Sequence, residues 1–159
     1  MCIRDSWHIV GASPGPRIQK IHDGASIWVH GFVETEILSQ LLKQIQVCIV
    51  PLFIGGGIRV KILDMMGWGI PCVSTSVGAQ GIDSNSILVR DSPQGFAESI
   101  TRLLTDSEFW HNVSLQGLDY VRQYHSLSRF EAIFETVLAQ VQKCGRGIES
   151  VLVRQCTEV

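Results

Sequence analysis

This sequence has little net charge and no long apolar run, and each absence excludes a class of protein. The 13 Lys and Arg residues are balanced by 15 Asp and Glu residues, which leaves a formal net charge of −2. Nucleic-acid-binding domains usually carry a clustered basic face, whereas the basic residues here are scattered, so we expect no nucleic-acid partner. No window of about 18 unbroken apolar residues occurs, and the sequence therefore predicts no transmembrane helix.

The cysteines exclude two further kinds of site. No two of the five cysteines have the spacing of metal ligands. Their odd number argues against the disulfide framework of a secreted protein. Cys48 and Cys72 lie in short apolar runs, where we interpret them as small buried hydrophobic residues. These features favour a reducing, cytoplasmic compartment, and no cluster of His, Asp or Glu predicts a metal.

The first six residues stand apart from the rest. Residues 1–6 correspond to the translated mosaic end of transposase-based sequencing libraries, and Trp7 then begins directly on an apolar run. We therefore exclude residues 1–6 as an adapter scar. We expect the remainder to be the back part of a longer protein.

The rest of the sequence has the composition and pattern of an α/β fold. It is 45% hydrophobic and 18% charged, which predicts one sizeable core and about one domain, at 7–143. Short apolar runs alternate with amphipathic segments up to about Leu88, which is typical of a Rossmann-like parallel sheet with flanking helices. The expected strands are 7–10, 27–29, 47–50, 72–74 and 87–89, and the expected helices between them are 17–22, 36–44 and 58–68.

After the last strand the pattern is helical only. Ser92 followed by Pro93 predicts an N-cap with proline at the first helical position. Capping-box spacing occurs twice more, at Thr105 with Glu108 and at Ser128 with Glu131. We therefore expect three closing helices, followed by a loose tail at 144–159.

The segment 51–76 carries the strongest functional signal. Gly55, Gly56 and Gly57 follow an expected strand and precede a helix expected to begin near Ile58. Consecutive glycines let backbone N–H groups converge, and a helix N-terminus adds unpaired amides and a positive dipole end. The loop therefore predicts an anion site, although a simple tight turn would have the same spacing.

Three charged residues refine this prediction. Arg59 and Lys61 are expected in the first helical turn, where they could make charge-assisted contacts with a diphosphate; the alternative is that they are solvated surface charges. Asp64 lies further along the same helix and could accept hydrogen bonds from ribose hydroxyls, unless it simply faces solvent.

Ligands of an open parallel sheet bind beyond the carboxyl ends of its strands. The loops at those ends are 11–16, 30–33, 53–57 and 75–81. The glycine loop lacks the Gly-Lys-Ser/Thr ending of a Walker motif and the spaced glycines of the dinucleotide fingerprint. A dehydrogenase is therefore a distant alternative.

The segments 51–64 and 69–82, with 7–11 and 29–33 upstream, resemble the donor site of family 4 ("group 1") retaining glycosyltransferases of the GT-B fold. The resemblance covers Trp7 to about Val141 and corresponds to the C-terminal half of such enzymes. It implies a nucleotide diphosphate sugar donor, transfer with retention, no metal or other cofactor, and an N-terminal half that precedes Trp7. The acceptor would be a saccharide, a lipid-linked group or a protein, and polysaccharide assembly with peripheral contact at the inner membrane face would fit.

The resemblance also assigns residues to parts of the donor, although it identifies no catalytic residue. It implies Gly55, Gly56, Gly57, Ile58, Arg59 and Lys61 at the diphosphate and sugar, Asp64 at the ribose, Gly31, Phe32 and Val33 beside the base, and Thr75, Ser76, Gly78 and Gly81 in the donor pocket.

Two positions depart from the family pattern. Gly56 occupies the place of the first of two paired glutamates, and Asp64 replaces the second. A non-catalytic nucleotide-binding module is therefore an alternative, as is a nucleotide-sugar epimerase of the same fold. A phosphorylase is disfavoured because its cofactor lysine has no counterpart here. By itself, residues 7–159 are expected to be inactive, because half a cleft positions no acceptor.

Overall fold

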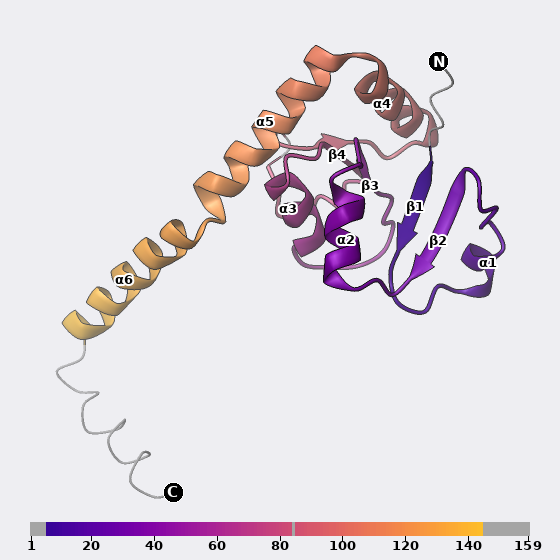
Figure 1. The fold of residues 1–159 in the computed structure, drawn as a ribbon. Helices are drawn as coiled ribbons and strands as arrows, with labels where there is room; N and C mark the ends of the chain where they lie inside the picture. The colour runs from indigo at the N-terminus through magenta and orange to yellow at the C-terminus, as the bar shows by residue number, and fades with distance from the viewer. Residues whose placement is uncertain (1–5, 84, 145–159) are drawn as a thin grey trace, which may run out of the picture. The chain divides into compact units, whose positions relative to one another are not determined.

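The computed structural model describes residues 6–83 and 85–144. The chain divides into two compact units, Met1–Ile45 (unit 1) and Gln46–Val159 (unit 2). Helices and strands alternate up to residue 74, a further strand follows with no helix between among the described residues, and three helices come after it (Figure 1). Of the predicted tail at 144–159, Cys144 is the last residue of a helix, and 145–159 lie outside the described residues.

Unit 1 contains two parallel strands, β1 (Trp7–Val10) and β2 (Ile27–Gly31), and two helices, α1 (Pro16–Gln19) and α2 (Thr35–Leu42). The Asp23 carboxylate accepts hydrogen bonds of 2.8 Å from three backbone N–H groups, of Ala25, Ser26 and Ile27, at the entry to β2. The expected helix 17–22 ends early, because His22 accepts the Val29 N–H and Asp23 forms this turn. The chain therefore turns toward β2 before a second helical turn can form.

Unit 2 contains the parallel strands β3 (Cys48–Val50), β4 (Cys72–Ser74) and β5 (Leu88–Val89), in that spatial order. Helix α3 (Val60–Gly67) connects β3 to β4. The closing helices are α4 (Pro93–Thr105), α5 (Ser107–Tyr124) and α6 (Leu127–Cys144). Each predicted strand is present, and every strand pair is parallel, which confirms the α/β class.

The strands form two sheets rather than the single sheet expected from the sequence. In the described part of the chain, β1 pairs with β2, and β4 lies between β3 and β5. Apolar runs predict which residues are extended, but the hydrogen-bond partners of a strand depend on tertiary structure. The sequence pattern therefore could not distinguish one sheet from two.

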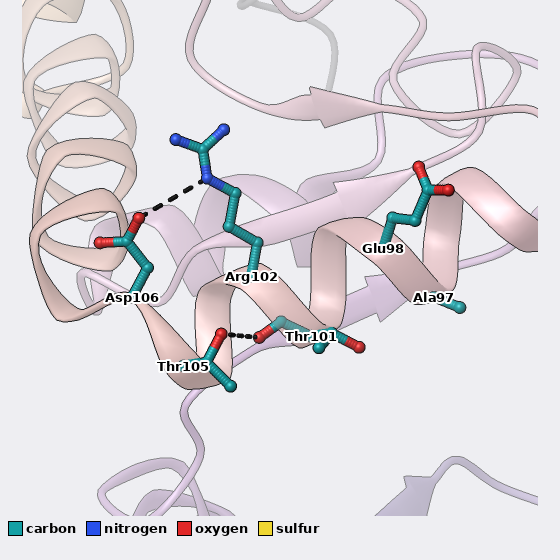
Figure 2. A pocket seen from close by; sticks show the side chains of 6 residues that line it. All are labelled: Ala97, Glu98, Thr101, Arg102, Thr105 and Asp106. Atoms are coloured by element: carbon teal, nitrogen blue, oxygen red, sulfur yellow. Dashed lines mark hydrogen bonds and ion pairs between the residues drawn. The ribbon is translucent and has the colours of Figure 1, made fainter.

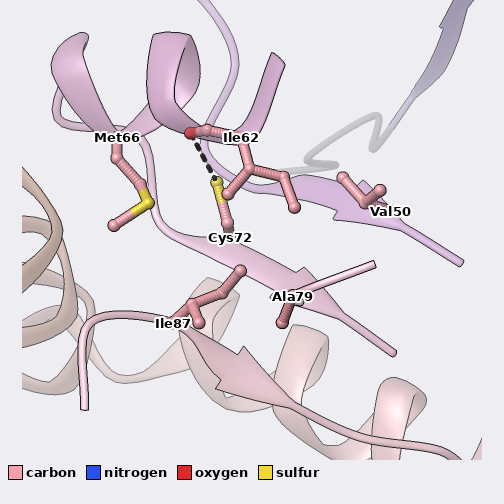
Figure 3. Packing of buried hydrophobic residues seen from close by; sticks show 6 residues of the cluster. All are labelled: Val50, Ile62, Met66, Cys72, Ala79 and Ile87. Carbon is pink, nitrogen blue, oxygen red and sulfur yellow. Dashed lines mark hydrogen bonds between the residues drawn. The ribbon is translucent and has the colours of Figure 1, made fainter. Parts of the chain in front are cut away.

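The core of unit 2 surrounds β4 on both faces. Cys72 packs with Ile62 and Met66 of α3, each at most 1% exposed (Figure 3). The next residue, Val73, points to the opposite face, where it packs with Leu103 of α4 and Val113 of α5. Successive side chains of a strand alternate between faces, so these two apolar clusters hold β4 from both sides.

Helix caps agree with the sequence at one position and differ at two. The Ser92 hydroxyl accepts the Gly95 N–H at 3.1 Å, which confirms the first cap. At α5, Asp106 accepts the Phe109 N–H at 2.9 Å, whereas Thr105 is the last residue of α4. At α6, Ser126 accepts the Arg129 N–H at 3.3 Å, and the predicted cap, Ser128, is inside the helix. Both predicted capping boxes were wrong because another capping residue lies within two positions.

No helix in the described ranges is both long and apolar enough to cross a membrane.

Candidate functional site

The glycine loop connects β3 to α3, and its backbone requires glycine at two positions. Gly55 has φ 138° and Gly57 has φ 79°, conformations that other residues rarely adopt. A Cβ atom on Gly55 would also collide with the Arg59 guanidinium, whose Cζ would lie 3.1 Å away. Gly56, in contrast, has no atom within 4 Å of the position of a Cβ. Gly55 therefore makes room for Arg59.

The Arg59 guanidinium is the most unusual group in this loop. Its Nε and Nη2 atoms are buried and have no hydrogen-bond partner among the described residues. Burying a charged group without a partner is costly, and a strong acceptor placed beside it would remove that cost. A carboxylate or phosphate oxygen is such an acceptor.

Helix α3 begins two residues later than expected. Arg59 is its N-cap residue, with φ −88° and ψ 89°, and its side chain makes no capping hydrogen bond. Ile58 and Arg59 therefore precede the helix, and only Lys61 of the predicted cations lies in its first turn. The reason is local: Gly-Gly-Gly-Ile-Arg offers no hydroxyl or carboxylate that would fix an earlier start. The helix dipole and unpaired amides still face the residues before Val60.

Lys61 and Asp64 lie on the exposed side of α3, opposite the buried Ile62 and Met66. They are three positions apart, which places both on one helix face. Their charged groups are thus accessible to a ligand or to solvent.

The loop after β4 lies directly against the glycine loop. Thr75, 1% exposed, donates a hydrogen bond to the Leu52 carbonyl and accepts the Gly78 N–H at 3.1 Å. A Cβ on Gly81, which has φ 83°, would lie 3.1 Å from Ile58 Cγ1. The structure therefore places the predicted loop 75–81 against Leu52 and Ile58, which flank the predicted loop 53–57.

Side chains of the loop 75–81 make hydrogen bonds within the protein. Ser76 directs both its N–H (2.8 Å) and its hydroxyl (3.0 Å) to the Asp91 carboxylate. At Gly78, a Cβ would lie 3.1 Å from the Val50 carbonyl oxygen. Thr75, Ser76 and Gly78 thus fix the backbone of the loop.

In unit 1, the predicted base-side residues end β2. Gly31 has φ 68°, Phe32 is 72% exposed, and Val33 is half-buried. An open hollow of about 340 Å³ lies beside Gly31 and is lined also by Pro14, Gln19, His22, Val29 and His30. Of the three predicted residues, Gly31 alone lines this hollow, at the carboxyl end of β2.

Sequence reasoning missed a histidine pair beside Gly31. His8 Nδ1 lies 2.9 Å from His30 Nε2, and the two rings stack with centroids 5.1 Å apart. Burial lowers the pKa of His8, and the positive charge that His30 can carry lowers it further. Neither strand alone signals this pair, because it depends on the register, in which His8 is paired with Trp28, two residues before His30.

A second hollow, of about 550 Å³, is lined by α4 and the residue that follows it (Figure 2). Two of its three charged side chains are paired with each other, since Arg102 Nε lies 3.7 Å from Asp106 Oδ2, and the Arg102 Cζ also lies 3.7 Å from the Phe109 ring centroid. None of the predicted site residues lines it. In the described ranges, no group of three His, Cys, Asp or Glu residues could hold a metal ion.

Residues 3–106 match the family described as "Glycosyl transferases group 1". This range includes the glycine loop, α3, the loop 75–81 and Gly31–Val33. No curated protein sequence matches the chain significantly.

Three solved structures have a similar fold. Sucrose-phosphate synthase from Thermosynechococcus elongatus is 17% identical with a TM-score of 0.67, and the match covers 87% of this chain and 39% of that one. The C-terminal domain of LpcC, a glycosyl transferase group 1 family protein from Francisella tularensis, is 15% identical with a TM-score of 0.58 (70% and 60% covered). TarM is 14% identical with a TM-score of 0.64 (84% and 28% covered). The chain thus spans less than two thirds of each of these structures.

Proposed function

The chain belongs to the group 1 glycosyl transferases, and on that premise we propose that its glycine loop binds the diphosphate of a nucleotide-sugar donor. In a full-length protein, the sugar would pass from this donor to an acceptor with retention of configuration. The donor, the acceptor and the stereochemistry are parts of this proposal.

The observation that carries the proposal is the pair of buried atoms Nε and Nη2 of Arg59, which have no hydrogen-bond partner among the described residues and belong to the guanidinium that lies against Gly55. Diphosphate oxygens are strong acceptors and would satisfy Nε and Nη2 together, since arginine binds phosphate through two parallel hydrogen bonds. Lys61 in the first turn of α3 and the positive end of the helix dipole add to the same potential. Three sources of positive charge therefore converge on one short segment.

The chemical role of this segment follows from the charge that develops during transfer. When the bond to the sugar breaks, negative charge accumulates on the departing diphosphate. Preorganised amides and cations stabilise such charge most strongly where water is excluded. We propose that Arg59 and Lys61 supply this stabilisation without a metal, and that the rigid 75–81 loop holds Ile58 and the glycine backbone in place.

We assign the ribose hydroxyls to Asp64. Its carboxylate is exposed and lies one turn beyond Lys61 on α3, so a nucleotide whose diphosphate lies at Arg59 could reach it. The assignment of the base to Gly31, Phe32 and Val33 is part of the proposal and rests on the family resemblance alone.

A direct test separates the diphosphate contact from the ribose contact. Calorimetric titration with UDP, GDP and ADP should detect binding of at least one of them, and Asp64→Asn should weaken it. The same variant should leave pyrophosphate binding unchanged, because pyrophosphate has no ribose. Asp119→Asn, at an exposed position of α5, is the matched control. If Asp64→Asn left nucleoside diphosphate binding unchanged, the ribose assignment would be wrong.

A non-catalytic nucleotide-binding module is the second candidate, and it is favoured by Gly56 in the place of an acidic residue. The two candidates differ in turnover. A full-length protein containing this sequence should consume a UDP-, GDP- or ADP-sugar and yield a product with the donor's anomeric configuration by ¹H NMR. Nucleotide binding without consumption of any donor, across saccharide and lipid-linked acceptors, would favour the binding module.

A further inference from the structure

We propose that Cys48 and Cys72 form a redox-sensitive dithiol. Peroxide oxidises the two thiols to a disulfide, and formation of this disulfide loosens the first turn of α3. The proposal concerns the strands beneath the glycine loop and does not depend on the identity of any ligand. It begins from the strand register, in which Cys48 of β3 is the direct partner of Cys72 of β4.

The register places the two sulfur atoms on the same face. Directly paired residues of parallel strands project to one side of the sheet, and both cysteines pack against the cluster beneath α3. Neighbouring strands lie about 4.7–4.9 Å apart, within the Cα separation of about 4.4–6.8 Å that disulfides span. The usual Cβ separation of a disulfide is shorter, at about 3.5–4.5 Å, so closure requires the two strands to shift slightly.

The two thiols differ in a way that suits stepwise oxidation. Cys72 is 1% exposed, whereas Cys48 is half-buried on β3, at one side of the three-stranded sheet. Hydrogen bonding from Cys72 and the nearby charge of Lys61 lower the pKa of Cys48. The hydrogen bond to Cys48 and burial raise the pKa of Cys72. Because the thiolate is the nucleophile, Cys48 is the residue that reacts first.

The chemistry balances with hydrogen peroxide as the oxidant. The Cys48 thiolate attacks one peroxide oxygen, the O–O bond breaks, and the products are a sulfenic acid and hydroxide, which takes up a proton as water. The Cys72 sulfur then attacks the Cys48 sulfur, loses its proton and expels the sulfenic oxygen as a second water. Two electrons leave the pair of thiols and reduce one peroxide to two waters.

Closure would act on α3 through the packing of Cys72. Its sulfur lies 4.0 Å from the Ile62 carbonyl oxygen (Figure 3). The Ile70 carbonyl oxygen is 3.5 Å away. Ile62 is fully buried and follows Lys61 directly. A tightly packed core tolerates such movements poorly, so drawing Cys72 toward Cys48 should disturb the start of α3. A strained disulfide is also more easily reduced, which makes the step reversible.

The test uses the whole chain with Cys2, Cys144 and Cys156 changed to serine, so that the proposed pair alone remains. Treatment with hydrogen peroxide followed by N-ethylmaleimide should yield a monomer that has lost two hydrogen atoms, and its digest should contain a linked Cys48–Cys72 peptide. Dithiothreitol should restore both thiols. Backbone amides at 60–64 should exchange hydrogen faster in the oxidised form, whereas those of α5 should not change.

Two further variants test the order of reaction. Cys72→Ser should accumulate a dimedone-reactive sulfenic acid at Cys48, whereas Cys48→Ser should react much more slowly with peroxide. Failure to form the linked peptide in folded protein, with linkage seen only in urea, would overturn the dithiol. A linked protein with unchanged exchange at 60–64 would overturn the effect on α3.

Discussion

The two units of this chain are stabilised by different interactions. In unit 2, two apolar clusters enclose β4, and Ile62, Val73 and Met66 are at most 1% exposed. In unit 1, Leu42 is the one buried side chain among residues 6–45, and hydrogen bonds, stacked rings and the Asp23 turn accompany the β1–β2 pair. Apolar burial is insensitive to protonation, whereas carboxylate and imidazole contacts are not. The two units should therefore respond differently to core truncation and to acid.

The largest expected effect is on the core of unit 2. Ile62→Ala removes a fully buried side chain from beneath α3, and such truncations cost about 2–5 kcal/mol of unfolding free energy. Ile37→Ala in α2 is the matched control, because Ile37 is 53% exposed, and its cost should be much smaller. Urea unfolding followed by circular dichroism measures both. Equal losses for the two variants would contradict the contrast between the units.

The next effect concerns the glycine loop of unit 2. Gly55→Ala should cost on the order of 1–3 kcal/mol, because alanine is strained at φ 138° and its Cβ would displace Arg59. Gly56→Ala is the matched control, since open space surrounds that position and its φ is not in the left-handed region. Differential scanning calorimetry should show a lower Tm for the first variant and little change for the second. Similar Tm values would mean that Gly55 is not required by the loop.

A smaller effect is expected at the Asp23 turn of unit 1. Asp23→Ala removes the acceptor of three backbone N–H groups, so hydrogen exchange in β2 should accelerate. The turn also lowers the pKa of Asp23 far below its usual range, chiefly through the Ile27 N–H. The contribution of the Asp23 turn to stability is therefore present above about pH 4, which is the ordinary pKa of an Asp side chain. It is lost as the pH falls further. Exchange in β4 provides the internal control, and equal acceleration there would contradict a local role.

The smallest effect is the pH response of the histidine pair. The pKa of His8 is lowered in the folded state, so the unfolded chain binds more protons as the pH falls through the ordinary value of about 6.5. The β1–β2 pair should therefore be less stable at pH 5.5 than at pH 7.5. The hydrogen-exchange protection factors of β1 amides at the two pH values measure this difference in stability. His8→Gln should remove most of the difference between the protection factors. An unchanged difference in that variant would assign the response to another group.

Much of the fold follows from the sequence. The strands Trp7–Val10 and Cys72–Ser74 have the predicted bounds, because each is a short apolar run between turn residues. Helix starts were less predictable, since Asp106 and Thr105 can both cap and spacing alone does not choose between them. The partners of each strand are set by contacts distant in the sequence, and this is why one predicted sheet became two.

The residues of the candidate site could be named from the sequence, but their geometry could not. The glycine loop and the charge of Arg59 are visible in the sequence, although the same residues would fit a tight turn with solvated cations. The position of the guanidinium above Gly55 depends on a φ angle that the sequence does not specify. The pairing of His8 with His30 depends on the register of two strands and could not be predicted from either strand alone.

The most direct test of the account is calorimetric titration of the chain with pyrophosphate, comparing the natural sequence with Arg59→Gln and Arg102→Gln. Hydrogen bonds to charged groups are worth about 1.5–3 kcal/mol, so Arg59→Gln should weaken binding about tenfold or more. Arg102→Gln should leave binding unchanged, because that guanidinium is already engaged with Asp106 and Phe109. No binding to the natural sequence, or equal binding to all three proteins, would contradict an anion site at Arg59.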